Sequence, residues 1–262
     1  MKKLLKLLVI GLVLLVVLAA LAVHLLLDGA IKRGVETIGP KVTKVDVKLN
    51  SANLLLLSGS GKLSGFFIGN PEGFKTPGAI SVGSTSIALE PRSLLADKVV
   101  VKSIELQSPE ITFETGLNVK ENNLNKILAN IQETVGGGSA SEPAKPKEPA
   151  ANAGKKLQVD SFRIVGGKLH VAVTAFGNRS ANLNLPEIHL KDLGKGPEGI
   201  TAAELSKVVL DALEKQAEAV ALTAISDLSK QGIYMSNELG KGATNTVEKA
   251  TKGIGDFFKK KQ

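Results

Sequence analysis

The first hydrophobic pattern in the chain is an unbroken apolar segment that follows three lysines. Lys2, Lys3 and Lys6 precede 21 residues, Leu7 to Leu27, in which His24 is the one polar side chain. A helix rises about 1.5 Å per residue, so this segment would be about 30 Å long, the thickness of the hydrocarbon core of a bilayer. We therefore predict a lysine-rich start and a transmembrane anchor over residues 1–30. The candidate anchor residues are Leu7, Leu8, Leu12, Leu14, Leu15, Leu18, Leu21, Leu25, Leu26 and Leu27.

A cleaved signal peptide is the alternative interpretation of this segment. Ala20-Leu21-Ala22 fits a cleavage site that would leave a mature chain starting at Val23. The apolar core of a signal peptide usually spans about 7–15 residues, whereas this segment continues to Leu27. The length favours a retained anchor, and the preceding lysines favour a cytoplasmic N-terminus with the rest of the chain exported.

After the anchor the hydrophobic period changes to two, the period of a half-buried strand. Val45, Val47 and Leu49 alternate with polar residues, and Leu54–Leu57 is predicted as another short strand. Ile111 and Phe113 follow Ser108-Pro109 and the strand before it, an arrangement that predicts a hairpin. Further strands are predicted at Phe66–Ile68, Ile80–Val82, Ile87–Leu89, Val99–Val101 and Ile104–Leu106.

A helix and a polar segment separate this first unit, residues 31–135, from a second one. Leu124, Ile127, Leu128, Ile131 and Val135 recur with the helical period. Residues 136–156 are rich in Gly, Ser, Ala, Pro, Lys and Glu, a composition that predicts a flexible linker without a core of its own.

Alternation returns in residues 157–230, which we expect to form a second hairpin unit followed by a helix. Thr201 and Glu204 have the spacing of a capping box at the helix start. Residues 231–262 form a basic tail. The predicted fold is α+β: an N-terminal transmembrane helix, then a groove-like sheet of strand hairpins with two or three amphipathic helices.

The two units contain an internal echo. Val101-Lys102-Ser103-Ile104-Glu105-Leu106 aligns with Val159-Asp160-Ser161-Phe162-Arg163-Ile164, and Ile111 and Phe113 align with Leu169 and Val171 at the same offset. Two matching hairpins, that is, one strand-hairpin unit used twice, would produce this similarity. Chance similarity of two alternating segments is the alternative.

Composition and charge exclude several classes of function. The chain has no cysteine, so it has no disulfide framework and no thiolate metal site. Aromatic residues make up 3%, too few for stacking on single strands, and we expect no nucleic-acid partner. The net charge of +8 includes the linker and the tail. The tail is a candidate membrane-surface segment, and its candidate residues are Phe257, Phe258, Lys259, Lys260 and Lys261. A loose C-terminus or a helix that caps the sheet is the alternative.

No motif predicts catalysis. The glycines between residues 59 and 65 lack the spacing of a phosphate loop or a dinucleotide fingerprint. His170 and His189 lie on predicted strands without a nucleophile elbow or a zinc-binding motif beside them. We expect no catalytic residue, no metal and no cofactor.

A succession of short motifs resembles the AsmA-like family of bacterial envelope proteins. It begins with the N-terminal anchor, and it covers roughly residues 1–215. The other motifs are Leu55 to Gly61 entering Gly65-Phe66, Asn70-Pro71-Glu72-Gly73-Phe74, Ile87-Ala88-Leu89-Glu90-Pro91 with Ser93-Leu94-Leu95, Val101 to Phe113, Asn122-Asn123-Leu124-Asn125, and Leu185 to Leu193 followed by Gly199-Ile200-Thr201.

The resemblance implies a protein similar to bridge-like lipid-transfer proteins, whose β-groove has an apolar inner face. It also implies phospholipid traffic and outer-membrane integrity as the field of action, with the inner membrane, phospholipid and other envelope proteins as partners. The exported domain would lie in the periplasm. This chain lacks the long repeated β-region of full-length members.

From the residues themselves, we expect any functional surface to be the apolar face of the sheet. The alternative is a structural or scaffold protein that binds other envelope proteins without a lipid ligand. The candidate lipid-facing residues are Val45, Val47, Leu49, Ile87, Leu89, Val99, Val101, Ile104 and Leu106.

Overall fold

The computed structural model describes residues 27–116, 118–136, 155–174 and 179–226. A helix occupies residues 27–43 of this part, and another occupies residues 202–226. Between them lie β1 (Val47–Leu55), β2 (Ser60–Gly69), β3 (Gly78–Leu89), the short 3-10 helix η1 (Pro91–Leu95), β4 (Lys98–Gln107), β5 (Glu110–Thr115), α2 (Asn123–Val135), β6 (Lys156–Val165), β7 (Lys168–Val173), β8 (Arg179–Asn184) and β9 (Ile188–Leu193). The α+β class is as predicted.

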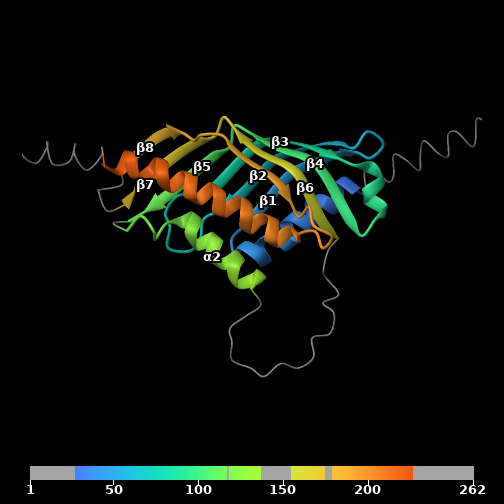
Figure 1. The fold of residues 1–262 in the computed structure, drawn as a ribbon. Helices are drawn as coiled ribbons and strands as arrows, with labels where there is room; N and C mark the ends of the chain where they lie inside the picture. The colour runs from blue at the N-terminus through green and yellow to red at the C-terminus, as the bar shows by residue number, and fades with distance from the viewer. Residues whose placement is uncertain (1–26, 117, 137–154, 175–178, 227–262) are drawn as a thin grey trace, which may run out of the picture.

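All nine strands belong to one curled sheet (Figure 1). β1, β2 and β3 are antiparallel neighbours, and β3 then pairs with β4 along one half and β5 along the other. β4 leads to β6 and β9, whereas β5 leads to β7 and β8. The sheet therefore continues from β3 as two connected branches.

The predicted hairpin around Ser108-Pro109 is wrong. β4 and β5 do not pair with each other. Each pairs with β3 on one side, and on the other side β4 pairs with β6 and β5 pairs with β7. Ser108 has a positive φ of 47°, which bends the strand without reversing it. β6 and β7 are likewise two parts of one bent path, with Gly166 at φ 64° between them.

The two echoed segments lie next to each other in the structure, although neither is the hairpin that was predicted. Lys98 pairs with Lys156 and Glu110 with Lys168, so one offset of 58 positions (156 − 98 and 168 − 110) runs through both pairs of parallel strands. Val101 faces Val159, and Ile111 faces Leu169. The two similar segments thus lie side by side, in parallel and in register.

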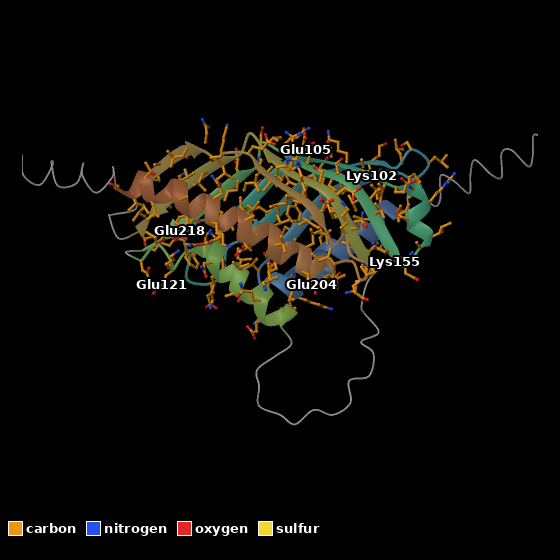
Figure 2. The ribbon with its side chains drawn as sticks, viewed as in Figure 1. Lys102, Glu105, Glu121, Lys155, Glu204 and Glu218 are labelled. Carbon is orange, nitrogen blue, oxygen red and sulfur yellow. The ribbon has the colours of Figure 1, made fainter. Side chains whose placement is uncertain are left out.

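α2 and helix 202–226 lie on the inner, concave side of the sheet, where they cross the strands (Figure 1). Their apolar residues join those of the sheet in one core, which includes Phe113, Ile127 and Leu213. Leu124 and Ile131 of α2 are also buried there, as the predicted helical period requires. The outer side is polar, and Figure 2 shows Lys102 and Glu105 on it, directed away from the helices.

Helix 27–43 covers the outer edge of β1. Asp28 Oδ1 accepts a hydrogen bond from Leu54 N at 3.0 Å, and Glu36 Oε1 accepts one from Leu49 N at 3.3 Å. Lys32 Nζ donates to Asn50 O at 3.2 Å. The three residues follow one another at intervals of four positions, so their side chains share one helix face. They bond backbone groups that an edge strand would otherwise expose.

Two predicted boundaries shift. Leu54–Leu57 is not a separate strand, because β1 continues to Leu55 and a turn follows it. The second unit begins at Lys156, inside the predicted linker, where Lys156 pairs with Lys98. The end of α2 is as predicted, with Gly136 as its C-cap.

Candidate functional site

The predicted lipid-facing residues divide into a buried and a partly buried set. Val45 and Val101 belong to the core under the helices. Val47 and Leu49 are buried too, and a Cβ on Gly39 of helix 27–43 would lie 2.7 Å from Val47 Cβ. These four residues are core residues in this structure. Ile87, Leu89, Val99, Ile104 and Leu106 are partly buried and pack against the core.

The partly buried set forms the inner surface of two neighbouring strands. Leu89 pairs with Val101, and Ile87 pairs with Ile104 across β3 and β4. The pairing of β3 with β4 shifts register between Ala88 and Leu89, and this shift interrupts the alternation of inward and outward side chains along β4. Val99 and Ile104 are an odd number of positions apart, and both therefore face inward. Leu205 and Val209 of helix 202–226 pack against the same core. The candidate site is therefore an apolar sheet face that a helix partly covers.

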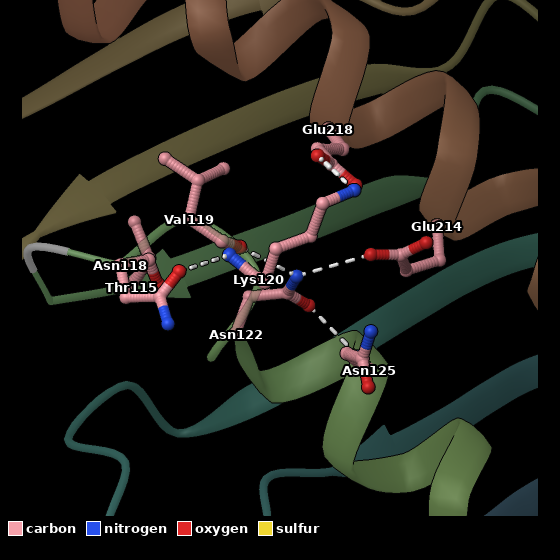
Figure 3. Close-up of polar contacts among 8 residues, drawn as sticks. All are labelled: Thr115, Asn118, Val119, Lys120, Asn122, Asn125, Glu214 and Glu218. Atoms are coloured by element: carbon pink, nitrogen blue, oxygen red, sulfur yellow. Dashed lines mark hydrogen bonds and ion pairs between the residues drawn. The ribbon is translucent and has the colours of Figure 1, made fainter.

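Two side-chain contacts hold helix 202–226 to the loop before α2 (Figure 3). Asn122 Nδ2 donates to Glu214 Oε1 at 3.1 Å, while Asn122 Oδ1 accepts from Asn125 N at 2.8 Å as the N-cap of α2. Glu214 is only 4% exposed. Lys120 Nζ lies 2.7 Å from Glu218 Oε1, and this hydrogen bond raises the pKa of Lys120 above its ordinary value.

The first turn of helix 202–226 has the predicted capping box. Thr201 N donates to Glu204 Oε2 at 2.7 Å, and Glu204 N donates to Thr201 Oγ1 at 3.1 Å. The backbone hydrogen bond from Thr201, followed by the one from its hydroxyl, lowers the pKa of Glu204 below its ordinary value. The helix that covers the apolar face is thus fixed at its start by local bonds and farther along by Asn122 and Lys120.

A buried carboxylate connects two of the sequence motifs. Glu114 of β5 is 2% exposed, and its oxygens accept from Lys75 N at 2.7 Å, Thr76 N at 2.8 Å and Thr76 Oγ1 at 2.6 Å. Glu114 N donates to Asn123 Oδ1 at 2.9 Å, and Asn123 Nδ2 donates to Asn70 Oδ1 at 2.7 Å. The turn at Asn70 and the start of α2 are therefore joined through one polar network. The network has a structural role, because its hydrogen bonds hold this turn against the start of α2.

The two histidines in the described part of the chain lie on the outer side of the sheet, each hydrogen-bonded to a neutral side chain. His170 Nδ1 is 2.8 Å from Asn182 Oδ1, and His189 Nε2 is 3.0 Å from Ser161 Oγ. Arg163, between Glu105 and Glu187, has its pKa raised chiefly by the hydrogen bond to Glu187. Within the described residues, no group of three or more His, Asp or Glu side chains is placed to hold a metal ion.

The burial of two glutamates and the exposure of two leucines were not predicted from the sequence. Glu114 and Glu214 occupy polar positions of an alternating strand and an amphipathic helix, so their burial has no sequence signal. Leu57 and Leu95 are 99% and 94% exposed. The run of four consecutive leucines at 54–57, which breaks the alternation, is the signal that could have marked Leu57.

The predicted anchor and tail lie almost entirely outside the described residues. Of the candidate anchor residues, Leu27 is described, as the first residue of the N-terminal helix; Phe257, Phe258 and Lys259–Lys261 are not. The described helices include none that combines the length and apolarity needed to cross a membrane.

Comparison with known proteins gives one family. A family model, that of the AsmA family, matches residues 1–260, nearly the whole chain. No curated protein and no solved structure matches significantly.

Proposed function

Because the chain belongs to the AsmA family, which indicates an envelope-associated role in assembly or lipid transport, we propose that it handles phospholipid at the inner membrane. Residues 7–27 would hold it there as a single span, with a cytoplasmic N-terminus. The β-rich domain would lie in the periplasm and serve outer-membrane assembly and integrity.

The observation that carries this proposal is the two-sided sheet. Its inner side presents Ile87, Leu89 and Val99 only partly covered, whereas its outer side carries charges such as Lys102 and Glu105. Burial of apolar area in place of water favours binding of an acyl chain by about 25 cal/mol per Å². A partly covered apolar face is the part of this molecule that offers such area.

Helix 202–226 would share this face with a lipid. Its start lies beside the first residues of β4, because Ile200 pairs with Leu157 and Leu157 pairs with Val99. Leu205 and Val209 in this first part of the helix pack against the core. We propose that acyl chains lie against β3 and β4 beside this helix, where the partly buried set is located.

Two adjacent residues of β4 provide a matched test. Val99 packs against the core, whereas Val100, the next residue, faces the opposite side of the sheet and is absent from that core. The full chain is extracted in mild detergent, and its phospholipid content is measured by mass spectrometry. We expect Val99→Lys to lose co-purified phospholipid and Val100→Lys to retain it, with both variants folded by circular dichroism. Equal lipid content in both variants would contradict the proposal.

A scaffold without a lipid ligand is the second candidate function. The observation that favours it is the complete burial of much of the inner face, with Val159 and Leu169 at the centre of the core. A parent chain that is monodisperse and free of phospholipid would support this alternative.

The anchor has its own test. Intact mass of the mature chain, purified from membranes, is expected to include residues 1–22. A mature N-terminus at Val23 would instead identify a cleaved signal peptide.

A further inference from the structure

Two leucines stand out because they pack against almost nothing in the protein. Leu57 is 99% exposed and Leu95 is 94% exposed. They belong to different loops, since Leu57 follows β1 and Leu95 ends η1. A fully exposed leucine contributes nothing to the folded core, so these two side chains are available to another apolar phase.

The two loops are in contact with each other at one end of the sheet. Gly59 O accepts a hydrogen bond from Leu89 N, two residues before η1 begins. Gly59 has a positive φ of 70°, and a Cβ there would lie 3.1 Å from the ring of Pro91. We call the surface formed by residues 55–57 and 91–95 the leucine tip. The turn at Gly59 requires glycine, both because its φ is positive and because a Cβ would crowd Pro91.

The chain enters the described structure beside this tip. Asp28 Oδ1 accepts from Leu54 N at 3.0 Å, so the start of helix 27–43 lies next to the strand end that carries Leu55 and Leu57. Figure 1 shows η1, the turn after β1 and the beginning of the N-terminal helix at the same end of the sheet. The predicted membrane span ends at Leu27.

Two basic residues lie beside Leu95. Lys155 Nζ donates to Leu94 O at 2.6 Å and to Ala96 O at 3.2 Å, and Arg92 lies in η1 itself. Two acidic residues flank this loop: Glu90, which pairs with Lys102, and Asp97. Exposed leucines beside Lys and Arg side chains are the combination that suits the headgroup region of a phospholipid membrane.

We propose that the leucine tip is a membrane-docking surface, and that its partner is the phospholipid surface of the bilayer that holds the predicted anchor. Leu57 and Leu95 insert at the boundary between headgroups and acyl chains, while Arg92 and Lys155 remain at headgroup level. The inference rests on the anchored arrangement in the proposed function and adds an orientation to it. The end of the sheet at Leu57 faces the membrane, and the opposite end, where helix 202–226 carries Leu222, faces away.

The test places a fluorescent probe at single cysteines, which is direct because the chain has none of its own. The full chain is reconstituted in vesicles of phosphatidylethanolamine and phosphatidylglycerol whose acyl chains carry a bromine quencher. Probes at Leu57→Cys and Leu95→Cys are expected to be quenched. The matched control is Leu222→Cys, another exposed leucine, at 49%, whose probe is expected to remain unquenched. Equal quenching at all three positions would overturn the proposal.

A second variant separates insertion from mere proximity. In Leu57→Ser/Leu95→Ser, with the probe at Leu55→Cys, we expect the ratio of docked to undocked protein to fall about tenfold for each leucine removed. The Tm should equal that of the parent, because neither leucine packs in the protein. Unchanged quenching, or a lower Tm, would overturn the proposal. The phospholipid content of the double variant is measured as well. If it equals that of the parent, the proposed function is supported independently of the docking proposal.

Discussion

Ser108 and Gly166 lie side by side on neighbouring strand paths, and both have a left-handed backbone, with φ angles of 47° and 64°. Ser108 N donates to Val165 O at 2.8 Å, and a Cβ on Gly166 would lie 3.2 Å from Ser108 Oγ. The two residues occupy equivalent positions in the repeated segments. The adjacent strand paths therefore bend along one line.

This bend predicts an asymmetric response to substitution. Gly166→Ala should lower the free energy of unfolding by about 1–2 kcal/mol, because a Cβ is disfavoured in the left-handed region. Ser108→Gly should change it by less than about 1 kcal/mol, since relief of strain offsets the entropy of glycine. Urea denaturation measures both. Gly196→Ala is the control, as a Cβ there meets no atom within 4 Å, and an equal effect at Gly166 and Gly196 would contradict the prediction.

The buried carboxylate of Glu114 should be a large contributor to stability. Glu114→Gln replaces one acceptor oxygen by an amide that faces the donors of Lys75 and Thr76. We expect a loss of about 2–3 kcal/mol in the free energy of unfolding, the range for hydrogen bonds to a charged group. Glu110→Gln, an exposed position on the same strand, should change it by less than about 0.5 kcal/mol. Similar losses for both variants would show that Glu114 has no special role.

The capping box predicts a defined pH dependence. The pKa of Glu204 is lowered in the folded state, so its contribution is fully present above the ordinary glutamate value of about 4.3 and is lost as the pH falls through the lower folded value. Glu204→Gln should therefore have a lower Tm than the parent at pH 7. The difference should shrink as the pH is lowered below about 4. A difference in Tm that is constant with pH would argue against ionisation of Glu204 as the cause.

Asn122 can be tested by a substitution that keeps one of its two bonds. Asn122→Asp retains an N-cap acceptor for Asn125 N but removes the donor to Glu214 and places two carboxylates together. We expect a loss of about 2–4 kcal/mol at pH 7, because a buried carboxylate is left facing a like charge. The loss should diminish in acid, where one carboxyl takes up a proton. Asn118→Asp, in the exposed part of the same loop, serves as the control.

Local patterns predicted the elements well wherever the cause was itself local. The period of Leu124 to Val135 predicted α2, and the spacing of Thr201 and Glu204 predicted a cap that the structure contains. The echo of Val101 with Val159 predicted a repeated unit. In each case the residues that decide the structure lie within one turn or one strand of each other, or in a repeat of the same segment.

Errors arose where distant partners decide the outcome. Ser108-Pro109 is a turn sequence, but β3 and the β6–β7 path offer hydrogen bonds on both sides, so the strand bends and continues. Glu114 occupies a polar position in an alternating strand, and only the return of residues 75–76 over it makes that position buried. The alternation that suggested lipid-facing residues is equally required by a core, and Leu49 and Val101 are core residues.

The in-register pairing of the two similar segments has an evolutionary consequence. The second copy pairs on its far side with β9 and β8, which run antiparallel to it. A further copy placed between the second copy and these two strands would meet the same edge that the second copy now meets on the first. In the described part of the chain, β8 and β9 have no strand on their outer edge, whereas Asp28, Lys32 and Glu36 close the edge at β1. Growth by duplication would therefore run in one direction, away from the N-terminal helix, and each added strand would lengthen the sheet by about 4.8 Å.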